Sequence, residues 1–510
     1  MERGISLLGL FVMLILAWGL SSHKTKVSWR IVTGGLFLQF VFAFLILKTA
    51  RGEAVFQSIG DFFTAVLGFV DEGSAFLFDV FPRPGEEPGF PAQYTLWRSF
   101  AFGILPTIVF FSALMSILYH IGLMQLIVRG FAWLMQKTLG TSGAETLSAA
   151  ANVFVGQTEA PLVIRPYVST MTLSELNVVM VGGFATIAGG VLAAYVGMGI
   201  DAGHLLTASV ISAPASLLIA KILQPETEQS KTAGKVEMEP ASKCVNVLEA
   251  AAEGTQAGLH LALNVGAMLL VFVALVAMGN ALLEWICTAI QERMGMQVEV
   301  ITLERLLGYA MSPFAWIMGV PKEECLQAGS ILGTRTVVNE FLAYIQLSGQ
   351  QADLSPRTNL ILTYALCGFA NFSSIGIQLG GIGGIAPERR SDLARLGLRA
   401  MIGGTLAAFM TACVVGFLLS DEDLERRAKK AVDRENAAVT HSEQDLHREH
   451  VLRDGHCVCG DYSVCGDHNA PGPYARHIAS AAERTAERTH SLAPVQQTRG
   501  NICPAPSRLI

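Results

Sequence analysis

The chain is short of charged residues, and this shortage excludes an ordinary soluble domain. Only 15% of its 510 residues are Asp, Glu, Lys or Arg, against roughly 25% in soluble proteins. The mean hydropathy is +0.45 although residues 420–510 are strongly polar, so the rest of the chain is more apolar still. A net charge of −6 offers no basic surface to a nucleic acid. The composition predicts an all-α, polytopic membrane protein with a lipid bilayer as its surroundings.

The chain also lacks the usual signs of a catalytic or ATP-using site. His120, His204 and His260 are isolated, and none of them suggests catalysis. The glycine-rich run GIQLGGIGG (376–384) stands at the end of an apolar segment without the strand–turn–helix context of a phosphate-binding loop. We therefore expect no cofactor. Five cysteines occur singly in the apolar part and read as small buried hydrophobes: Cys244, Cys287, Cys325, Cys367 and Cys413.

Several apolar runs approach the ~20 residues that cross a bilayer. We expect eight spans, at about 5–20, 31–48, 100–128, 176–198, 204–223, 259–286, 357–378 and 400–419. The first run, which follows Arg3, also fits a signal peptide, but a second span follows it closely. Residues 53–82 mix Phe with acidic residues at helical spacing, which predicts an interfacial helix.

The basic residues predict the orientation. They gather in SSHKTKVSWR (21–30) and PERRSDLARLGLR (387–399), which should both be cytoplasmic. The acidic region 53–87 and the turn GMGIDAGH (197–204) should face outward. Both termini are then expected on the outside. We predict a multi-pass protein of the cell (inner or plasma) membrane.

Two stretches are too polar to span, and they resemble each other. Residues 141–172 and 320–352 are rich in small residues, and each carries one acid in mid-segment, Glu159 and Glu340. Irregular backbone at membrane depth is tolerated where it is buried or lines a cavity, so we expect two re-entrant hairpins. Further on, GGFATIAGG (182–190) matches CGFANFSSIG (367–376). The matching elements are separated by an odd number of spans, which predicts an inverted repeat and alternating access.

Polar side chains in these segments predict a ligand, because buried acids and amides in a bilayer normally face a substrate or ion path. Gln157, Thr158 and Glu159 offer donors and acceptors suited to the edge of a planar heterocycle. The alternative for Glu159 is a helix cap or an ion pair with Arg165. A second cluster suits a polyhydroxylated group such as ribose, with an apolar wall beside it, unless its amide and hydroxyl only join helices: Glu340, Asn371, Ser374 and Phe369.

Three motifs resemble the signatures of the concentrative nucleoside transporter family in its short, eight-span bacterial form. They are GQTEAPL (156–162), GTRTVVNEFLAY (333–344) and ALCGFANFSSIGIQLGG (365–381), and they occur in the family's order. The resemblance extends from the first span to about residue 419. It implies a homotrimer whose subunits each have a scaffold and a mobile transport domain, and which imports nucleosides with a cation gradient.

The resemblance also implies roles for individual residues. By motif, the base would be bound by Gln157, Thr158, Glu159 and Val191, and the ribose side by Glu340, Asn371, Ser374 and Phe369. A sodium ion would be held by the side chains of Asn152 and Thr186 and the carbonyls of Val155 and Ile187. Neutral oxygens favour Na⁺ as the coupling ion, while proton-coupled relatives keep H⁺ open.

The expected organisation has five parts: scaffold (1–99), first repeat (100–225), cytoplasmic linker (226–258), second repeat (259–419) and a polar tail (420–510), which composition predicts to be disordered. HCVCGDYSVCGDH (456–468) has no standard zinc spacing, so we read it as an incidental cluster or a disulfide. Two other classes stay open. One is a membrane enzyme acting on a nucleotide-lipid, with Glu159 or Glu340 as general acid or base. The other is a gate-type protein that transports nothing.

Overall fold

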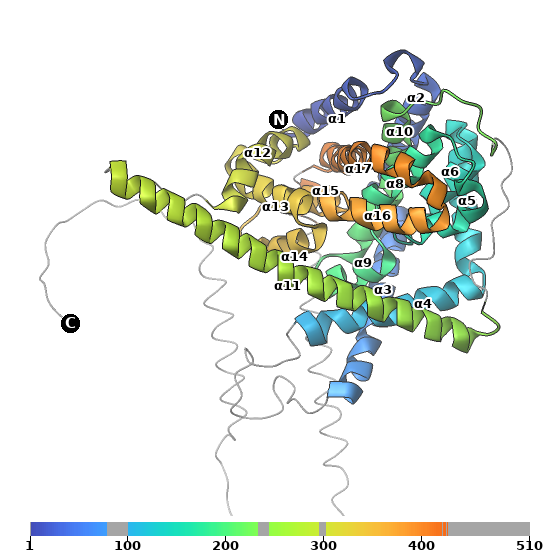
Figure 1. The fold of residues 1–510 in the computed structure, drawn as a ribbon, viewed down its shortest axis with the longest axis horizontal. Helices are drawn as coiled ribbons and strands as arrows, with labels where there is room; N and C mark the ends of the chain where they lie inside the picture. Colours follow the sequence, from blue (N-terminus) through green and yellow to red (C-terminus); the bar gives the residue numbers. More distant parts are fainter. Residues whose placement is uncertain are drawn as a thin grey trace, which may run out of the picture. The chain divides into compact units, whose positions relative to one another are not determined.

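A computed structural model describes residues 2–78, 100–232, 244–294, 302–420, 422–424 and 426, all within one compact unit, Met1–Asp433. Every regular element among these residues is a helix (Figure 1), which confirms the all-α prediction. Apart from residues 420, 422–424 and 426, the predicted tail, including its Cys/His cluster, lies outside the described residues.

Eight helices in the described part are long and apolar enough to cross a membrane, but they are not quite the eight expected. The segment Ala50–Val70 of α3 (Ala50–Phe78) qualifies, although the sequence reading judged this region too polar to span. Within this segment the only acids are Glu53 and Asp61, whereas Asp71 and Glu72 follow it. The expected span 357–378 does not qualify, because it is broken into two shorter helices.

The core is built around α10 (Ala202–Leu223) and α17 (Arg390–Leu418), which pack against each other. Around them pack α1 (Glu2–Gly19), α2 (Trp29–Leu47), α8 (Leu173–Ala185) and α15 (Pro356–Leu366). From Leu205 onward every residue of α10 is buried. An element that is apolar on all sides and fully enclosed is typical of the centre of a bundle.

A second group of helices lies at the side of this core. The longest helix, α11 (Val247–Met294), runs along α4 (Leu105–His120) and extends beyond it (Figure 1). It therefore begins inside the stretch predicted as a linker. The expected span 100–128 is interrupted: a π-helical turn, η4 (Phe100–Ile104), leads into α4, and Gly122 at φ +85° separates α4 from α5 (Leu123–Leu139).

Both predicted hairpins are interrupted helices. The first consists of α6 (Gly143–Ala151), η5 (Ala160–Ile164) and α7 (Arg165–Val168). The second follows α12 (Leu303–Met318) and η6 (Lys322–Glu324), and consists of α13 (Cys325–Val337) and α14 (Glu340–Gln350). The next span of each repeat is broken as well, into α8 and α9 (Gly189–Gly197), and into α15 and α16 (Phe372–Ile385). The sequence reading expected these two spans, 176–198 and 357–378, to be continuous.

The loops sort to the two ends of the bundle as the charge pattern predicted. In the first basic loop, the Ser22 N–H donates to Leu223 O at the end of α10, at 2.9 Å. In the second, which contains η7 (Pro387–Arg389), Arg389 donates to the carbonyls of Ser169 and Met171 at the base of the first hairpin. Both basic loops therefore lie at one end.

The acidic segments lie at the other end. Gly60 of α3 packs against Gly203 in the first turn of α10. At the same end of the core, Lys48 after α2 pairs with Asp423 after α17, and this hydrogen bond holds the pKa of Asp423 well below its usual range.

The first helix is built into the core. Ser6 is buried, and its hydroxyl donates to Met318 O at 2.7 Å and accepts from Arg357, which also pairs with Glu2 at 3.2 Å.

Four of the five cysteines are buried as predicted, whereas Cys244 is half-buried because it precedes α11 at the surface.

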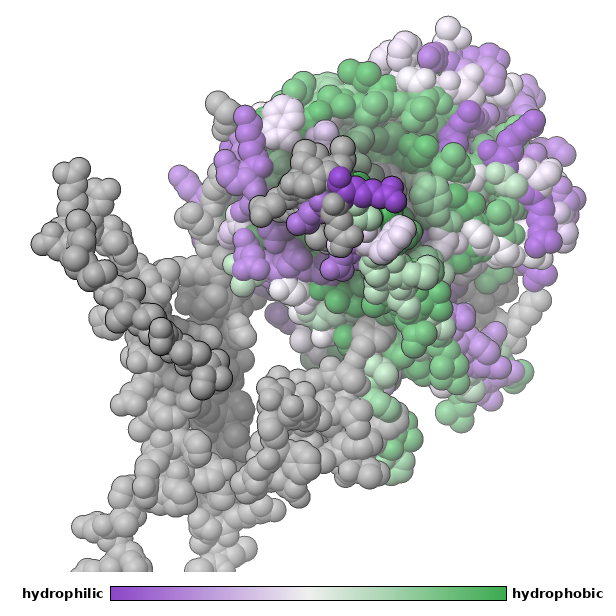
Figure 2. All heavy atoms as spheres, turned by 60° about the vertical axis from the view of Figure 1, so that its left-hand side comes forward, coloured by the Kyte–Doolittle hydropathy of each residue, from purple (hydrophilic) through white to green (hydrophobic). Residues whose placement is uncertain are grey.

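The described surface carries many apolar side chains. In Figure 2 a broad hydrophobic region occupies the middle of this face, and hydrophilic residues gather towards its rims. Exposed large hydrophobics include Phe37 and Phe44 of α2 and a series along α11 from Leu259 to Ile290. This distribution suits a protein surrounded by lipid.

Candidate functional site

The two broken spans touch each other at their breaks. Gly368 has a φ of +131°, and a Cβ there would lie 2.4 Å from Phe184 O. Only glycine fits both the conformation and this close approach. The Gly-Phe-Ala motifs of the two repeats, 183–185 and 368–370, are thus brought into contact. The breaks define one place in the core where helix ends from both repeats converge.

Asn152 and Thr186, 34 positions apart, are brought to the same turn of α8. Asn152 caps the C-terminus of α6, is 1% exposed, and has no hydrogen-bond partner for its amide oxygen or nitrogen within the described residues. A Cβ on Gly182 would lie 3.0 Å from its nitrogen. Thr186 caps the C-terminus of α8 and donates to Gly182 O at 2.9 Å. The C-termini of both helices carry partial negative charge, so this region favours a cation.

The polar residues of the first hairpin meet α8 and α16. Gln157 is 6% exposed, and its Oε1 accepts from Gln378 Nε2 at 3.0 Å. Thr158 packs against Gly381. The Glu159 side chain is exposed, accepts from the Gly156 N–H at 3.2 Å, and makes no ion pair with Arg165, which is itself exposed. The predicted alternative of an Arg165 pair is therefore not realised.

The second polar cluster is more tightly joined. Glu340 begins α14 and is 4% exposed; its carboxylate accepts from Asn371 Nδ2 at 2.8 Å and from the Tyr195 hydroxyl at 3.2 Å. Asn371 caps α16, and its Oδ1 accepts from the Ser374 N–H at 2.9 Å. Glu340, Asn371 and Ser374 are thus brought together at the N-termini of two helices, which favour anions and acceptor oxygens.

The two clusters share helix α16. Gln157 reaches it at Gln378, and Glu340 reaches it at Asn371, seven residues earlier. At 1.5 Å per residue the separation along the helix axis is about 10 Å, comparable with a heterocyclic base joined to a sugar. Of the remaining predicted residues, Phe369 is partly exposed at the break, while Val155, Ile187 and Val191 are buried around the same breaks.

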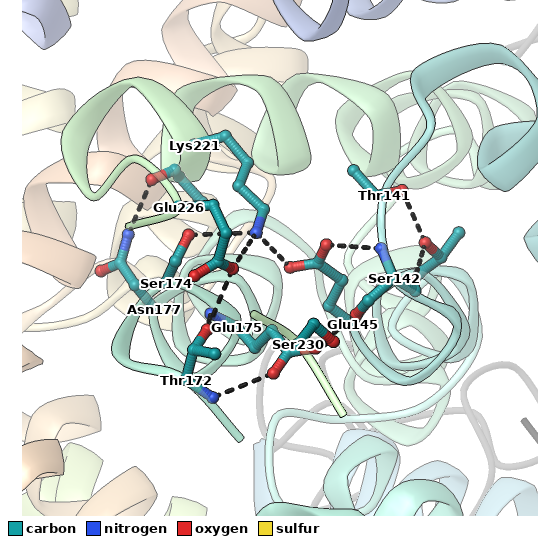
Figure 3. A network of polar contacts seen from close by, with 12 residues as sticks. Thr141, Ser142, Glu145, Thr172, Ser174, Glu175, Asn177, Lys221, Glu226 and Ser230 are labelled. Carbon is teal, nitrogen blue, oxygen red and sulfur yellow. Dashed lines mark hydrogen bonds and ion pairs between the residues drawn. The ribbon is translucent and has the colours of Figure 1, made fainter. Parts of the chain in front are cut away.

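A buried polar network holds the base of the first hairpin (Figure 3). Lys221 of α10 lies 2.7 Å from Glu145 Oε2, 3.2 Å from Glu226 Oε2, and donates to Ser174 Oγ at 3.0 Å. Glu175, which forms a capping box with Thr172 in the first turn of α8, accepts from the hydroxyls of Ser142, Ser230 and Thr232. The network fastens the hairpin to α8, α10 and the segment after α10.

Three residues escaped the sequence reading. Gln378 is fully buried and donates to Gln157 and to Met180 O, at 3.0 and 3.1 Å. Tyr195 binds Glu340. Ser148, one turn before Asn152 and on the same side of α6, is buried with a hydroxyl that lacks a partner within the described part of the chain. Gln378 stood inside a quoted motif, and its polarity in an apolar run was a usable signal; Tyr195 and Ser148 gave none.

Among the described residues, no group of three or more His, Cys, Asp or Glu side chains is placed to hold a metal ion. The oxygens around Asn152 are neutral amide, hydroxyl and carbonyl groups. Such hard ligands suit an alkali cation and do not suit zinc or other transition metals.

Three family models match consecutive parts of the chain. Residues 8–81 match "Na+ dependent nucleoside transporter N-terminus", residues 101–202 match "Nucleoside recognition", and residues 204–416 match "Na+ dependent nucleoside transporter C-terminus". Together they cover both hairpins and both broken spans.

Named proteins match over most of the chain. An uncharacterized transporter of Haemophilus influenzae is 44% identical over 420 residues, which cover 81% of this chain and 97% of that protein. Solute carrier family 28 member 3 of Eptatretus stoutii is 43% identical and sodium/nucleoside cotransporter 1 of Rattus norvegicus is 40% identical. The match covers 82% and 83% of this chain but only 61% and 65% of those two longer proteins.

Solved structures of CNTnw share the fold. An inward-facing, substrate-bound structure gives a TM-score of 0.73 at 41% identity, covering 82% of this chain and 98% of that one. An outward-facing variant gives 0.76 at 41% identity, covering 82% and 97%. The fold predicted from the repeat is thus found in proteins solved in two opposite-facing states.

Proposed function

The chain belongs to the concentrative nucleoside transporter family, and from this premise we propose that it imports nucleosides by alternating access, coupled to Na⁺. The relatives named above are transporters and not enzymes, which sets aside the alternative of a membrane enzyme acting on a nucleotide-lipid. We place the protein in the cell membrane, as its apolar helices require.

The observation that carries this proposal is the meeting of the two broken spans. Gly368 of one repeat touches Phe184 of the other, and polar side chains from both hairpins reach α16. Interrupted helices in corresponding positions of inverted repeats are the usual site of substrate and ion in secondary transporters. A protein that only gates or signals has no need of two polar clusters at that point.

We assign the base to the Gln157 side and the ribose to the Glu340 side. Gln157, Thr158 and Glu159 offer amide, hydroxyl and carboxylate groups to a base edge, and Val191 an apolar surface. Ionised Glu340 accepts hydrogen bonds, as the hydroxyls of a ribose would require, and Asn371 and Ser374 complete its surroundings. Phe369 would cover the sugar from its partly exposed position.

For the coupling ion we propose the cage of Asn152, Val155, Thr186 and Ile187. Support comes from the unpartnered amide of Asn152 and from the two helix C-termini that end beside it. Ser148 adds a hydroxyl on the same side of α6. Proton coupling is the alternative, and it would use a carboxyl group rather than these neutral oxygens.

The assembly we propose is a homotrimer in which α4 and α11 form the static scaffold. α11 packs mainly on α4 and exposes apolar side chains along its length, including Leu263, Leu270 and Met278. The contacts favour a different domain boundary from the expected one, because α1 and α2 pack on α10 and α17 rather than on α4 and α11. We therefore assign α1 and α2 to the mobile part.

Uptake of labelled uridine and adenosine tests the function. The protein would be produced in cells without nucleoside uptake, with and without external Na⁺. Accumulation above the external concentration, dependent on the protein and on sodium, is expected. Binding without accumulation would favour a gate-type protein, and the absence of both would contradict the proposal.

A further inference from the structure

Arg335 is the largest side chain in the described core that is fully buried. It stands in the last turn of α13, is 0% exposed, and none of its three guanidinium nitrogens has a hydrogen-bond partner within the described residues. A guanidinium offers five N–H donors and is always charged. Burying such a group is costly unless a charge compensates it, so its position calls for a nearby anion.

The surroundings of Arg335 contain one acid. Its guanidinium carbon lies 5.8 Å from the ring centroid of Phe409, a cation–π contact. Arg335 stands in the last turn of α13 and Glu340 in the first turn of α14, five positions later, and both are buried. The titratable groups that face the guanidinium are Glu340, Tyr344, Cys367 and Tyr195. Tyrosine and cysteine are ordinarily neutral at pH 7, so the only source of negative charge in this set is Glu340.

The hydrogen bonds around Glu340 fit an ionised carboxylate. Asn371 Oδ1 accepts from the Ser374 N–H and the Ser373 hydroxyl, which fixes the amide so that Nδ2 faces Glu340. An amide nitrogen can only donate, so Oε2 must accept. The Tyr195 hydroxyl donates to Oε1, and both oxygens of Glu340 are therefore acceptors.

We propose that Arg335 is the buried counter-ion of Glu340, and that it excludes protons from the coupling by keeping this carboxylate ionised in the substrate site. The inference rests on the proposed function, because it concerns how that transporter selects Na⁺ over H⁺. It gives Arg335 a positioning and charge-setting role without contact to the substrate.

Other titratable groups face the pair and must be separated from it. Tyr195 comes from α9, Tyr344 from α14 and Cys367 from the break after α15; beyond them, His204 of α10 lies 3.1 Å from the Tyr364 hydroxyl. These groups are unchanged when position 335 is altered. A pH dependence that appears in a 335 variant and disappears when Glu340 is also changed would therefore belong to Glu340.

The test compares Arg335→Met, Arg335→Lys, Glu340→Gln and the double variant Arg335→Met/Glu340→Gln with the wild type. Uptake is measured at saturating Na⁺ between pH 5.5 and 8.5. We expect wild type and Arg335→Lys to vary less than about twofold. Arg335→Met should lose most uptake at pH 8.5. It should regain at least tenfold on acidification, because the Glu340 carboxyl, left without its counter-ion, then takes a proton. The double variant should be insensitive to pH. Thr334→Val, which alters a hydroxyl bonded within α13, should behave as wild type.

A second readout does not depend on transport. The thermal midpoints of the purified proteins in detergent form a double-mutant cycle for positions 335 and 340. We expect Arg335→Met to lower the midpoint and Glu340→Gln to restore part of the loss. If the two substitutions change the thermal midpoint additively, or if the pH profile of Arg335→Met is flat, Arg335 is not the counter-ion of Glu340. If the wild type fails to transport while the cycle shows coupling, the proposed function fails and the role of Arg335 as counter-ion of Glu340 stands. If Arg335→Met does not fold, comparing the double variant with Glu340→Gln still decides the matter: a large further loss contradicts the pairing.

Discussion

At the scale of single residues, the proposed site consists of polar groups whose partners lie far away in the chain. Gln157 is held by Gln378 of the other repeat, and Glu340 by Tyr195 of the other repeat and by Asn371 of its own. These bonds fix the side chains in place without using all of their capacity. A substrate that adds bonds to preorganised groups loses less entropy on binding, so changes at these positions should act on affinity more than on folding.

Replacing Gln157 with Ala should weaken nucleoside binding far more than the binding of free ribose. The variant removes the proposed base contact, so a donor or acceptor of the bound base loses its partner, while Gln378 still donates to Met180 O. A buried group left unpaired costs about 1–3 kcal/mol, or roughly a ten- to hundredfold loss of affinity. Competition against labelled uridine measures this loss. Ser216→Ala, which removes a buried hydroxyl bonded within its own helix, is the control. An unchanged uridine affinity would remove Gln157 from the site.

Replacing Glu340 with Gln should blur the distinction between sugars. The wild type should bind 2′- and 3′-deoxynucleosides less well than ribonucleosides, because the carboxylate accepts from hydroxyls. The neutral amide is a weaker acceptor, since hydrogen bonds to charged groups are about twice as strong, so the ratio should shrink. Inhibition constants for the three sugars measure it. Glu304→Gln, a carboxylate bonded to Asn280 on α11, should keep the wild-type ratio. Full discrimination in Glu340→Gln would assign Glu340 another task.

At the scale of elements, each repeat positions its hairpin by anchoring the base and leaving the tip at the helix breaks. The anchor of the first hairpin is the network of Lys221, Glu145 and Glu175 (Figure 3). Asn152 and Gln157 follow the end of α6, away from this anchor. The second hairpin is held differently, by Glu324, which accepts from Ser355, and by Arg357, which donates to Gly319 O. An anchored hairpin base allows the polar side chains at the hairpin tip to be positioned accurately.

Replacing Lys221 with Met should destabilise the protein strongly. The Glu145 carboxylate is 1% exposed, and removing one partner of a buried ion pair costs about 3–5 kcal/mol because the other charge stays buried. We expect the thermal midpoint in detergent to fall by about 5–10 °C. Lys231→Met, at an exposed position, should leave it unchanged. The double variant with Glu145→Met should recover much of the loss; equal midpoints for all the variants would mean that the network does not anchor the hairpin.

At the scale of the whole molecule, the proposed ion cage and the proposed substrate site share the first hairpin and the break after α8. Asn152 ends α6 and Gln157 follows five residues later, against Gly183. Ligands that order the same segment bind cooperatively, and linkage makes the effect equal in both directions. Sodium should therefore tighten uridine binding by the same factor by which uridine tightens sodium.

Replacing Thr186 with Ala should raise the sodium concentration needed for half-maximal uptake while the protein stays folded, because one hydroxyl is lost from the cage. The test uses membrane vesicles that contain the protein. A sodium gradient and a pH gradient are imposed separately, and the accumulation of uridine is measured in each case. We expect accumulation with sodium alone. Full accumulation with a pH gradient and no sodium would mean that protons drive the protein and that Asn152 and Thr186 only pack together.

Composition, polar residues and motifs were enough to predict the membrane class, the places of the two hairpins, a repeat and the family. These predictions need only the composition, the polar residues inside apolar stretches and three motifs in order. All of these can be read from the chain without knowing which segments pack together. The two basic loops were also assigned correctly to one end, because charge excluded from lipid leaves a clear pattern.

Where the spans break, and which side chains meet, depends on tertiary packing. The window Leu173–Gly197 is 94% buried, and a segment enclosed on all sides has no amphipathic period that a break could interrupt. The separation of α4 from α5 at Gly122 was missed for a related reason, since both flanks are apolar. The pairs Gln157–Gln378 and Tyr195–Glu340 lie 221 and 145 positions apart in the chain. Their contact follows from how two repeats pack, and packing is decided by shape at long range, which no local pattern records.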